Sequence, residues 1–432
     1  MRVVVVGGGL GGMASAARLA KLGHEVVLVE RSADLGGALG TVRAGDHTWD
    51  AGPTKTLLPA VLRDLFRKSG RPLERELELV PLAAIREHRF ADGSTLRLPA
   101  GSRAAQRSAF EELAPGLGDR WTSYVDALGQ DWELLRRDYL ERPWDPGLAD
   151  PGAVRRLASR QTLRSRLREA LGEQRLQQVA AHPFTVDGHD PARVPAWLGT
   201  VSYVEQKFGA WTVPGGMAQV GEALARRLAT RKVEVLTGTS AHDVVVRSGR
   251  AAALSTSAGE LDADAVVCAV DPTRLPTLAR HVRRTRSTTP PSLVHLGLRG
   301  EVPALDCEVV LHGAPDLSVH PGGTAPDGGA SWTVAYRGRT SEDVLETMAR
   351  RGLDVRACVV ERVERTPAQL SAQWGGSPLG VRWQGRGTVR RRLGPTTPVP
   401  GVYAAGSHAT PGSGIPFVGL SAALVAQAIG RA

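Results

Sequence analysis

The stretch MRVVVVGGGLGG, residues 1–12, decides the fold, because in it a run of valines passes directly into glycines. Gly7, Gly9 and Gly12 have the spacing G-x-G-x-x-G. Between a strand and a helix, the first glycine permits a tight turn and the second lets the backbone approach a pyrophosphate. The third lets the helix pack closely on the strand. The stretch therefore predicts a strand–helix unit that binds a phosphate-bearing ligand.

The residues that follow complete this pattern. A segment rich in alanine runs to Gly23 and predicts a helix, whose N-terminus would direct free N–H groups and a positive dipole at the phosphates. A second hydrophobic run, Val26 to Val29, ends in Glu30, an acid placed to accept hydrogen bonds from ribose hydroxyls. Together these elements predict a site for the adenosine diphosphate half of a dinucleotide.

Further glycines indicate which dinucleotide is bound. Gly36-Gly37 and the stretch WDAGPT at 49–54 follow the acid, where a longer FAD molecule needs backbone contacts along its pyrophosphate and ribityl chain. At the other end, Val402 to Ala405 reads as a buried strand, followed by GSHATPGSGIP at 406–416 and a helix from Val418 to Ile429. This second strand, glycine turn and helix is suited to presenting N–H groups to the electron-rich end of a flavin. The sequence therefore favours FAD.

The chain resembles the phytoene desaturase-like branch of the FAD-dependent amine oxidase and carotenoid desaturase superfamily. Four segments carry the resemblance in order: the N-terminal fingerprint, VPGGM at 213–217, AVVCAVDP at 265–272 and GVYAAGSHATPGSG at 401–414. The last is the most specific, since it is close to the bacterial-type phytoene dehydrogenase signature. The family usually has an arginine where this chain has Ala38, and the chain is somewhat shorter than a typical phytoene desaturase.

The resemblance implies an α/β fold, with a discontinuous Rossmann-type FAD-binding domain and an inserted α+β substrate-binding domain. We expect the FAD-binding domain to comprise residues 1–100, 205–270 and 387–432, and the substrate-binding domain residues 101–204 and 271–386. The expected FAD contacts are Gly7, Gly9, Leu10, Gly11, Gly12, Glu30, Arg31, Gly36, Gly37, Ala38, Gly52, Pro53, Thr54, Val244, Gly406, Ser407, Gly414, Ile415, Pro416 and Val418. Val244 is included because a strand near this position packs beside the adenine in the family.

Composition limits the function classes. With 432 residues and 42% hydrophobic residues, the chain predicts two intertwined domains of a packed enzyme. No stretch approaches the ~20 apolar residues of a transmembrane helix, and the first residues read as a strand, so a cytoplasmic location is expected. The three cysteines, Cys268, Cys307 and Cys358, are too widely spaced to predict a metal site or a disulfide framework.

The net charge of +10 is carried almost entirely by arginine. Seven arginines between 155 and 175 surround an apolar row of Leu163, Leu167 and Leu171, which predicts an amphipathic helix. Such a helix is either a solvated face of the substrate-binding domain or a peripheral contact with an anionic membrane. No nucleic-acid-binding module is present, and nucleic acid is not expected as a partner.

The expected chemistry is hydride transfer from a lipophilic polyene or isoprenoid to flavin N5, with a quinone or oxygen taking the electrons onward. Polar candidates for a catalytic role are His182, Asp187, Tyr203 and His408, of which His408 is preferred because it lies in the flavin loop. A hydrogen bond that shapes the turn is the other reading of His408. Tyr203, Phe208 and Trp211 are expected to line an apolar substrate tunnel, with ordinary core packing as the alternative.

Three other functions fit the same motifs. One is an isomerase or saturase that uses reduced flavin on a similar substrate, and another is an oxidase of an amine or a porphyrinogen. The third is a non-catalytic FAD-binding partner of a membrane assembly, which flavin reduction by any substrate would exclude. The sequence does not identify the substrate, because such enzymes select by tunnel shape rather than by a motif.

Overall fold

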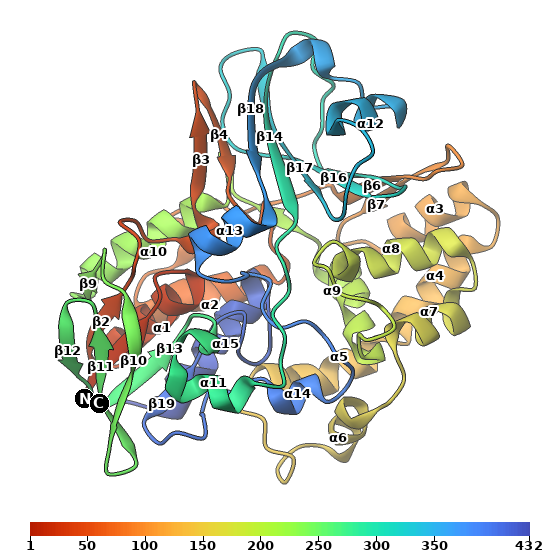
Figure 1. Ribbon diagram of the computed structural model, residues 1–432. Coiled ribbons are helices and arrows are strands. Elements are labelled where there is room, and N and C mark those ends of the chain that lie inside the picture. The colour runs from red at the N-terminus through yellow and green to blue at the C-terminus, as the bar shows by residue number, and fades with distance from the viewer.

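The computed structural model describes residues 1–432 and contains a five-stranded parallel sheet in the order β19-β13-β1-β2-β9 (Figure 1). Its strands are β1 (Arg2–Val6), β2 (Glu25–Val29), β9 (Glu234–Leu236), β13 (Ala265–Cys268) and β19 (Val402–Ala404). The runs of valine fit a sheet that is covered on both faces. β2 and β13 lie on opposite sides of β1, so the glycine loop after β1 leaves the sheet at a point where the strand order reverses, which is where open α/β sheets bind ligands.

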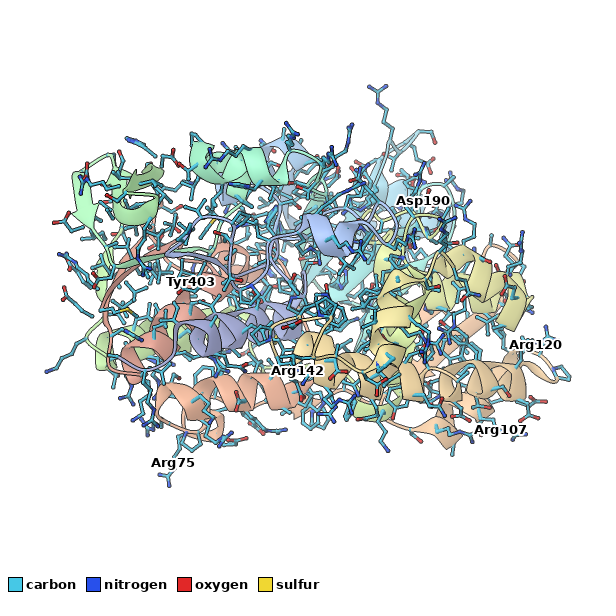
Figure 2. All side chains as sticks on the ribbon, turned by 90° about the horizontal axis from the view of Figure 1, so that it is seen from below. Arg75, Arg107, Arg120, Arg142, Asp190 and Tyr403 are labelled. Atoms are coloured by element: carbon cyan, nitrogen blue, oxygen red, sulfur yellow. The ribbon has the colours of Figure 1, made fainter.

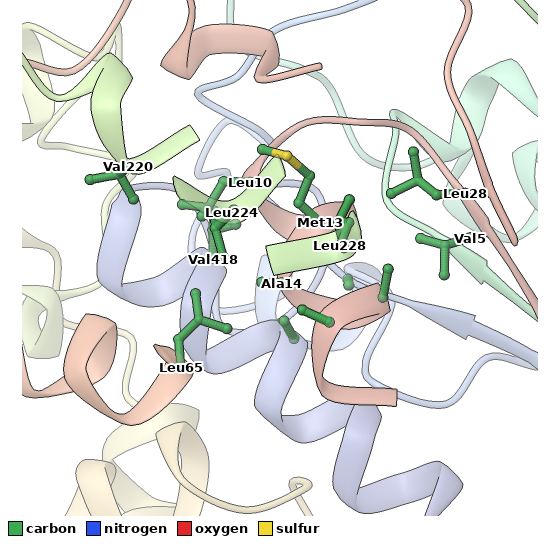
Figure 3. Packing of buried hydrophobic residues seen from close by; sticks show 14 of the residues in the cluster. Val5, Leu10, Met13, Ala14, Leu28, Leu65, Val220, Leu224, Leu228 and Val418 are labelled. Atoms are coloured by element: carbon green, nitrogen blue, oxygen red, sulfur yellow. The ribbon is translucent and has the colours of Figure 1, made fainter. Parts of the chain in front are cut away.

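Helices bury one face of this sheet (Figure 3). α1 (Leu10–Lys21) packs against α2 (Pro59–Ser69), α10 (Ala218–Thr230) and α15 (Ile415–Ile429). The shared core includes Met13, Leu224 and Val418, all buried. The other face is covered by a small antiparallel sheet and a helix, namely β10 (Ala241–Arg247), β11 (Arg250–Thr256), β12 (Gly259–Asp262) and α11 (Pro276–Val282). Residues from both ends of the chain therefore form one core.

A second, seven-stranded sheet has the order β18-β14-β17-β16-β15-β6-β7 and is antiparallel except between β15 and β6. Its strands are β6 (Ala84–Arg89), β7 (Thr95–Pro99), β14 (Ser292–Arg299), β15 (Glu308–Leu311), β16 (Leu317–Pro321), β17 (Gly329–Tyr336) and β18 (Val359–Arg365). The hairpin of β3 (Thr41–Ala44) and β4 (His47–Asp50) rises from the first sheet toward β17 and β18 (Figure 1). The smaller helices α12 (Val344–Arg350) and α13 (Pro367–Trp374) pack on this sheet. α14 (Thr388–Arg391) lies apart from it, with Val389 in the core of the helical layer described below, and β5 (Val80–Pro81) pairs with β8 (Trp211–Thr212).

A helical layer lies beside the second sheet (Figure 1). It consists of α3 (Arg103–Leu113), α4 (Leu117–Asp126), α5 (Gly129–Leu135), α6 (Pro151–Ala158), α7 (Leu163–Leu171), α8 (Gln174–Thr185) and α9 (Thr200–Phe208). Residues 101–204 are therefore mainly helical. None of the helices in the structure is both long and apolar enough to cross a membrane.

The pairing of β6 and β7 alters the expected division of the chain. Both strands fall within residues 1–100, which we assigned to the FAD-binding domain, yet they extend the seven-stranded sheet. β6 joins this sheet by pairing with β15. The sequence did not show the pairing, because the two strands are more than 200 residues apart and no local pattern reveals their contact. We propose that residues 84–99 belong with the substrate-binding part of the fold.

The arginine-rich segment is also arranged differently from the expected single helix. α6 ends at Ala158 and α7 begins at Leu163. The apolar row of α7 is buried in the core of the helical layer, and arginines of the segment pair with Asp131, Asp190, Glu173 and Asp92. This arrangement favours a helix whose arginines face solvent over one that lies on a membrane, because the apolar row already packs against other helices of the protein.

Candidate flavin and substrate site

A cavity of 830 Å³ lies between the two sheets and the helical layer. It begins at the glycine loop after β1, passes the N-terminus of α15 and reaches α8, α9 and the seven-stranded sheet. Segments from both ends and from the middle of the chain therefore form a single site. Its size and its position at the carboxyl ends of the parallel strands are those of a cofactor and substrate pocket.

The glycine loop has room for a pyrophosphate where the motif requires it. A Cβ atom added to Gly9 would meet nothing within 4 Å, so this position faces open space in the cavity wall. A Cβ on Gly12 would overlap the carbonyl oxygen of Gly7, and one on Gly7 would lie 2.6 Å from a Val270 methyl group. Gly7 also has a φ of 103°, which favours glycine. The loop thus leaves one face open and packs the others tightly.

Glu30 lies at the end of β2 beside this open face. Its carboxylate accepts hydrogen bonds from the N–H groups of Gly8 at 2.6 Å and Ser32 at 2.8 Å. These bonds fix the carboxylate and still leave acceptor positions for ribose hydroxyls. Arg31 also lines the cavity, and its guanidinium donates to the carbonyls of Ala372 and Gln373 at the end of α13.

Two helices present uncapped N-termini to the cavity. α1 follows Gly9 and α15 follows Gly414, and neither glycine provides a side-chain cap. The free N–H groups and the helix dipoles are suited to the anionic pyrophosphate and to negative charge at the flavin N1 and O2 positions. The residues present therefore fit FAD at both ends of the molecule.

Asp50 joins two of the sequence motifs. Its carboxylate accepts hydrogen bonds from the N–H groups of Met217 at 3.0 Å and Ala218 at 2.9 Å, at the start of α10. Burial raises the pKa of Asp50, and these two bonds oppose the rise. Gly216, with a φ of 115°, leaves room for the carboxylate. The WDAGPT and VPGGM segments consequently form one wall behind the cavity.

Eighteen of the twenty residues expected to contact FAD line the cavity, and Gly12 and Val244 do not. Gly12 lies behind the loop, in the packing position that its motif assigns to it. The expectation that Val244 contacts FAD is wrong, because its side chain is buried in the core between β10 and the parallel sheet. In its place, Thr239, Ser240 and Ala241 line the cavity at the start of β10.

A family model described as flavin containing amine oxidoreductase matches residues 10–430. The chain belongs to this family. It is an FAD-dependent oxidoreductase, as the sequence motifs predicted. The family match and the two uncapped helix N-termini agree on the cofactor.

Within this family, the chain is similar to two carotenoid desaturases. A hydroxyneurosporene desaturase of Cereibacter sphaeroides is 29% identical over 99% of this chain and 97% of its own length. A 4,4'-diapophytoene desaturase of Staphylococcus aureus is 25% identical over 63% of this chain, and the match spans 55% of that relative. The predicted resemblance to carotenoid desaturases is confirmed.

Solved structures of the same fold include two amine oxidases and a Rab GDI. A putrescine oxidase bound to putrescine has a TM-score of 0.70 at 16% identity, with 99% of both chains covered. A cyclohexylamine oxidase from Brevibacterium oxydans has a TM-score of 0.68 at 18% identity, again with 99% of both chains covered. A Rab GDI from Plasmodium falciparum has a TM-score of 0.58 at 12% identity and covers 99% of this chain and 97% of its own. These likenesses show the fold and leave the substrate open.

His408 lines the cavity, but both of its ring nitrogens are engaged. Nε2 lies 3.3 Å from the carboxylate of Asp271 and from the hydroxyl of Ser287, and Nδ1 lies 3.3 Å from the hydroxyl of Ser407. Burial alone would raise the pKa of Asp271, but hydrogen bonds from His408 and Thr273 hold it well below its usual range. This environment favours the turn-shaping reading of His408 over a catalytic one.

The aromatic residues expected to line the substrate tunnel lie elsewhere. Tyr203 packs on Gly129 of α5, Phe208 is partly exposed beside Trp132, and the indole of Trp211 donates to the Phe208 carbonyl. None of these three residues lines the cavity. The face of α9 that does so carries Thr200, Val201, Val204 and Glu205. The prediction for these three residues is therefore wrong, because proximity in sequence to the VPGGM turn does not show which side chains of α9 and β8 face the cavity.

Other aromatic side chains line the substrate end of the cavity. They are Trp132, Tyr139, Phe184, Trp197, Trp383 and Phe417. Trp197 meets Tyr139 and Trp383 edge to face, with ring centroids 5.8 and 5.7 Å apart. Arg392 stacks over Trp383 at 4.7 Å and donates to the carbonyls of Pro411 and Val381. These rings come from segments that are far apart in the sequence, so no local motif identifies them.

A group of ionisable residues, which we call the polar cluster, interrupts this apolar wall. It consists of Lys55, His182, Asp187, Glu308 and His320, all of which line the cavity. Glu308 is buried and accepts from Lys55 Nζ at 2.5 Å and His182 Nε2 at 2.9 Å, with His320 at 3.9 Å. Although burial opposes ionisation, Lys55 and both histidines hold the pKa of Glu308 well below its ordinary value.

The histidines of the polar cluster are neutral near pH 7. Burial lowers the pKa of His182, and it lowers the pKa of His320 to about 4. Next to the cluster, Arg86 donates to both carboxylate oxygens of Glu205 at 2.8 Å in a buried bidentate pair. His182 and Asp187 were candidates in the sequence, whereas Lys55, Arg86, Glu205, Glu308 and His320 were not. Their partners lie on other strands or helices, which no local spacing shows.

Proposed function

We propose that this protein dehydrogenates a lipophilic polyene or isoprenoid, removing a hydride and a proton from adjacent carbons to form a new C=C bond. The observation that carries the proposal is one continuous cavity. It joins a site that fits FAD to a substrate end lined by aromatic side chains, which we call the aromatic chamber; they are Trp132, Tyr139, Phe184, Trp197, Trp383 and Phe417. The desaturase relatives support the same reaction class.

FAD supplies the two-electron acceptor for the hydride when it is bound. The residues of this chain would hold and shield it. The N–H groups at the starts of α1 and α15 would bind its anionic parts, and Glu30 would bind the ribose. Trp197, Trp383 and Phe417 would exclude water and orient a flat conjugated chain against the reacting centre. We propose a quinone or oxygen as the final electron acceptor.

The experiment begins with the visible spectrum of the purified protein and the identity of the flavin released on heating. The loaded protein is then mixed without oxygen with hydroxyneurosporene, with 4,4'-diapophytoene and with putrescine. We expect a polyene, and not the amine, to bleach the flavin band and to gain absorbance at longer wavelength as its conjugation extends. FAD-loaded protein that putrescine bleaches and both polyenes leave unchanged would contradict the proposal.

A further inference from the structure

The arginines of this chain have contrasting surroundings. Arg75, Arg107 and Arg120 extend from the outer surface, where water stabilises their charge (Figure 2). Four other arginines are buried, and these are Arg18, Arg86, Arg227 and Arg392. A guanidinium keeps its proton, and a buried charge without a counter-ion is costly, so each buried arginine requires an anion close by.

One of the four buried arginines lacks such an anion. The other three form ion pairs: Arg18 with Asp64, Arg86 with Glu205, and Arg227 with Glu76. Arg392 is only 6% exposed, and its hydrogen bonds go to backbone carbonyls alone. Burial lowers its pKa, and no carboxylate opposes this effect. The chain itself therefore supplies no counter-ion for Arg392.

The contacts of Arg392 fix its position and leave donors available. Its guanidinium stacks over Trp383 at 4.7 Å and donates to the carbonyls of Pro411 at 2.6 Å and Val381 at 3.3 Å. A guanidinium has several further N–H groups, and Nε of Arg392 has no hydrogen-bond partner. Because a peptide carbonyl is a neutral dipole, these two bonds hold the side chain without balancing its charge.

A second unpartnered donor lies near Arg392. Trp197 meets Trp383, the ring beneath the guanidinium, edge to face. The indole N–H of Trp197 is buried and has no acceptor in the protein. Arg392, Trp383 and Trp197 all line the cavity. A ligand with acceptor oxygens in this part of the cavity would therefore satisfy donors that the fold leaves without partners.

The surroundings indicate which anion fits. The N-termini of α1 and α15 are suited to the anionic parts of FAD, so the counter-ion of Arg392 is expected from the substrate. One guanidinium balances one negative charge, and its planar fork matches the two oxygens of a carboxylate. A phosphate group carries nearly two negative charges, whereas the wall around Arg392 is formed by the rings of Tyr139, Trp197 and Trp383 and offers no second cation.

We propose that Arg392 binds a carboxylate group of the substrate, with the indole N–H of Trp197 as a further donor, so that the enzyme prefers polyene carboxylic acids to uncharged polyenes. This inference rests on the proposed function and names the substrate class for the same site. The aromatic chamber takes the conjugated chain, and Arg392 takes its acidic end.

The test uses all-trans-retinoic acid and its methyl ester, which share one polyene chain and differ in charge. Binding of each to the FAD-loaded protein is measured at pH 8 by quenching of tryptophan fluorescence. We expect the acid to bind roughly ten- to hundredfold more tightly than the ester, as a hydrogen-bonded charge pair gives.

Three variants assign this preference to the two donors. Arg392→Gln should bring the ratio of the two Kd values close to one, because an amide can still donate to the neighbouring carbonyls but carries no charge. Arg392→Lys should keep part of the preference, because it retains the charge and loses the planar fork. Trp197→Phe keeps an aromatic ring, removes the N–H group and should lower the ratio by a smaller factor.

Arg391→Gln is the matched control, because Arg391 is the preceding residue and its side chain is exposed. We expect this variant to keep the ratio of the unmodified protein. Equal binding of acid and ester by the unmodified protein would overturn the inference. An Arg392→Gln protein that binds FAD and both retinoids more weakly by the same factor would also overturn it, since Arg392 would then only support the flavin loop.

These binding data are independent of the reaction. If the acid binds more tightly through Arg392 and no polyene reduces the flavin, the carboxylate site stands and the proposed function fails. If uncharged polyenes reduce the flavin and the acid has no advantage in binding, the proposed function stands and the inference about Arg392 fails.

Discussion

Gly9 and Gly12 belong to one motif but meet different surroundings, and this difference is testable. A Cβ at Gly9 would enter open cavity, whereas a Cβ at Gly12 would overlap the carbonyl oxygen of Gly7. Gly9→Ala should therefore leave the stability of the FAD-free protein unchanged and weaken FAD binding by about tenfold or more. Gly12→Ala should destabilise the FAD-free protein itself, because strand and helix must move apart.

Chemical denaturation of the FAD-free variants and FAD titration by fluorescence separate the two effects. Equal losses of stability in both variants would show that the loop does not leave Gly9 open.

Asp187 should make stability depend on pH. Burial raises its pKa from 3.8 to about 6, so between these values the folded protein binds the proton more tightly than the unfolded chain does. The contribution of Asp187 to the free energy of unfolding is therefore greatest below about pH 4, and it is lost as the pH rises through 6. Asp187→Asn removes this loss. It should stabilise the protein by as much as ~3 kcal/mol at pH 8 and by about half of that at pH 5.

Urea denaturation of the FAD-loaded protein and the variant at both pH values gives the measurement. A variant that is less stable than the parent at pH 8 would indicate that Asp187 has a favourable partner in the folded protein.

At the scale of single elements, α7 shows what an amphipathic pattern leaves open. Its periodicity identifies an apolar face, but the same pattern suits a membrane surface and a protein core. In the structure that face packs in the helical layer, with Leu167 only 2% exposed. The contacts of the helix, rather than its sequence, decide between the two surfaces.

Leu167→Ala should cost 2–5 kcal/mol of stability, the usual range for a buried leucine. Arg168→Ala on the exposed side of the same helix is the control and should change stability by no more than about 0.5 kcal/mol. The comparison is made by urea denaturation. A Leu167→Ala protein of normal stability that no longer binds anionic vesicles would instead place this face on a membrane.

At the scale of the whole molecule, the cavity depends on segments that are far apart in the sequence. The loop after β1, the turn after β13 and the N-terminus of α15 meet at one end, and α8, α9 and the seven-stranded sheet meet at the other. FAD bound across these segments should stabilise all of them together. At a free FAD concentration one hundred times Kd, we expect a gain of ~2.7 kcal/mol in the free energy of unfolding.

Denaturation of FAD-free protein at increasing FAD concentrations tests this gain, with AMP as a control ligand that reaches only the nucleotide end. Unfolding in two transitions, of which FAD shifts only one, would show that the two parts of the fold are stabilised independently.

The sequence by itself determined the cofactor site. Its parts are local: a glycine loop, an acid at the end of the next strand, and a second glycine turn before the last helix. Such features depend on backbone geometry over a few residues, so spacing alone reveals them. Glu30, Gly36 and Gly414 lie in the cavity wall for this reason.

Only the tertiary structure decided the substrate end. Tyr203 was placed wrongly because helix rotation depends on packing, and Glu308 was not found because Lys55 and His182 reach it from distant segments. The pairing of β6 with β15 likewise follows from contacts between remote strands. Binding a nucleotide requires a short stretch of backbone, whereas enclosing a substrate requires side chains from the whole chain. The nucleotide site can therefore be predicted from the local spacing of residues, whereas the substrate site forms only when distant segments come together on folding.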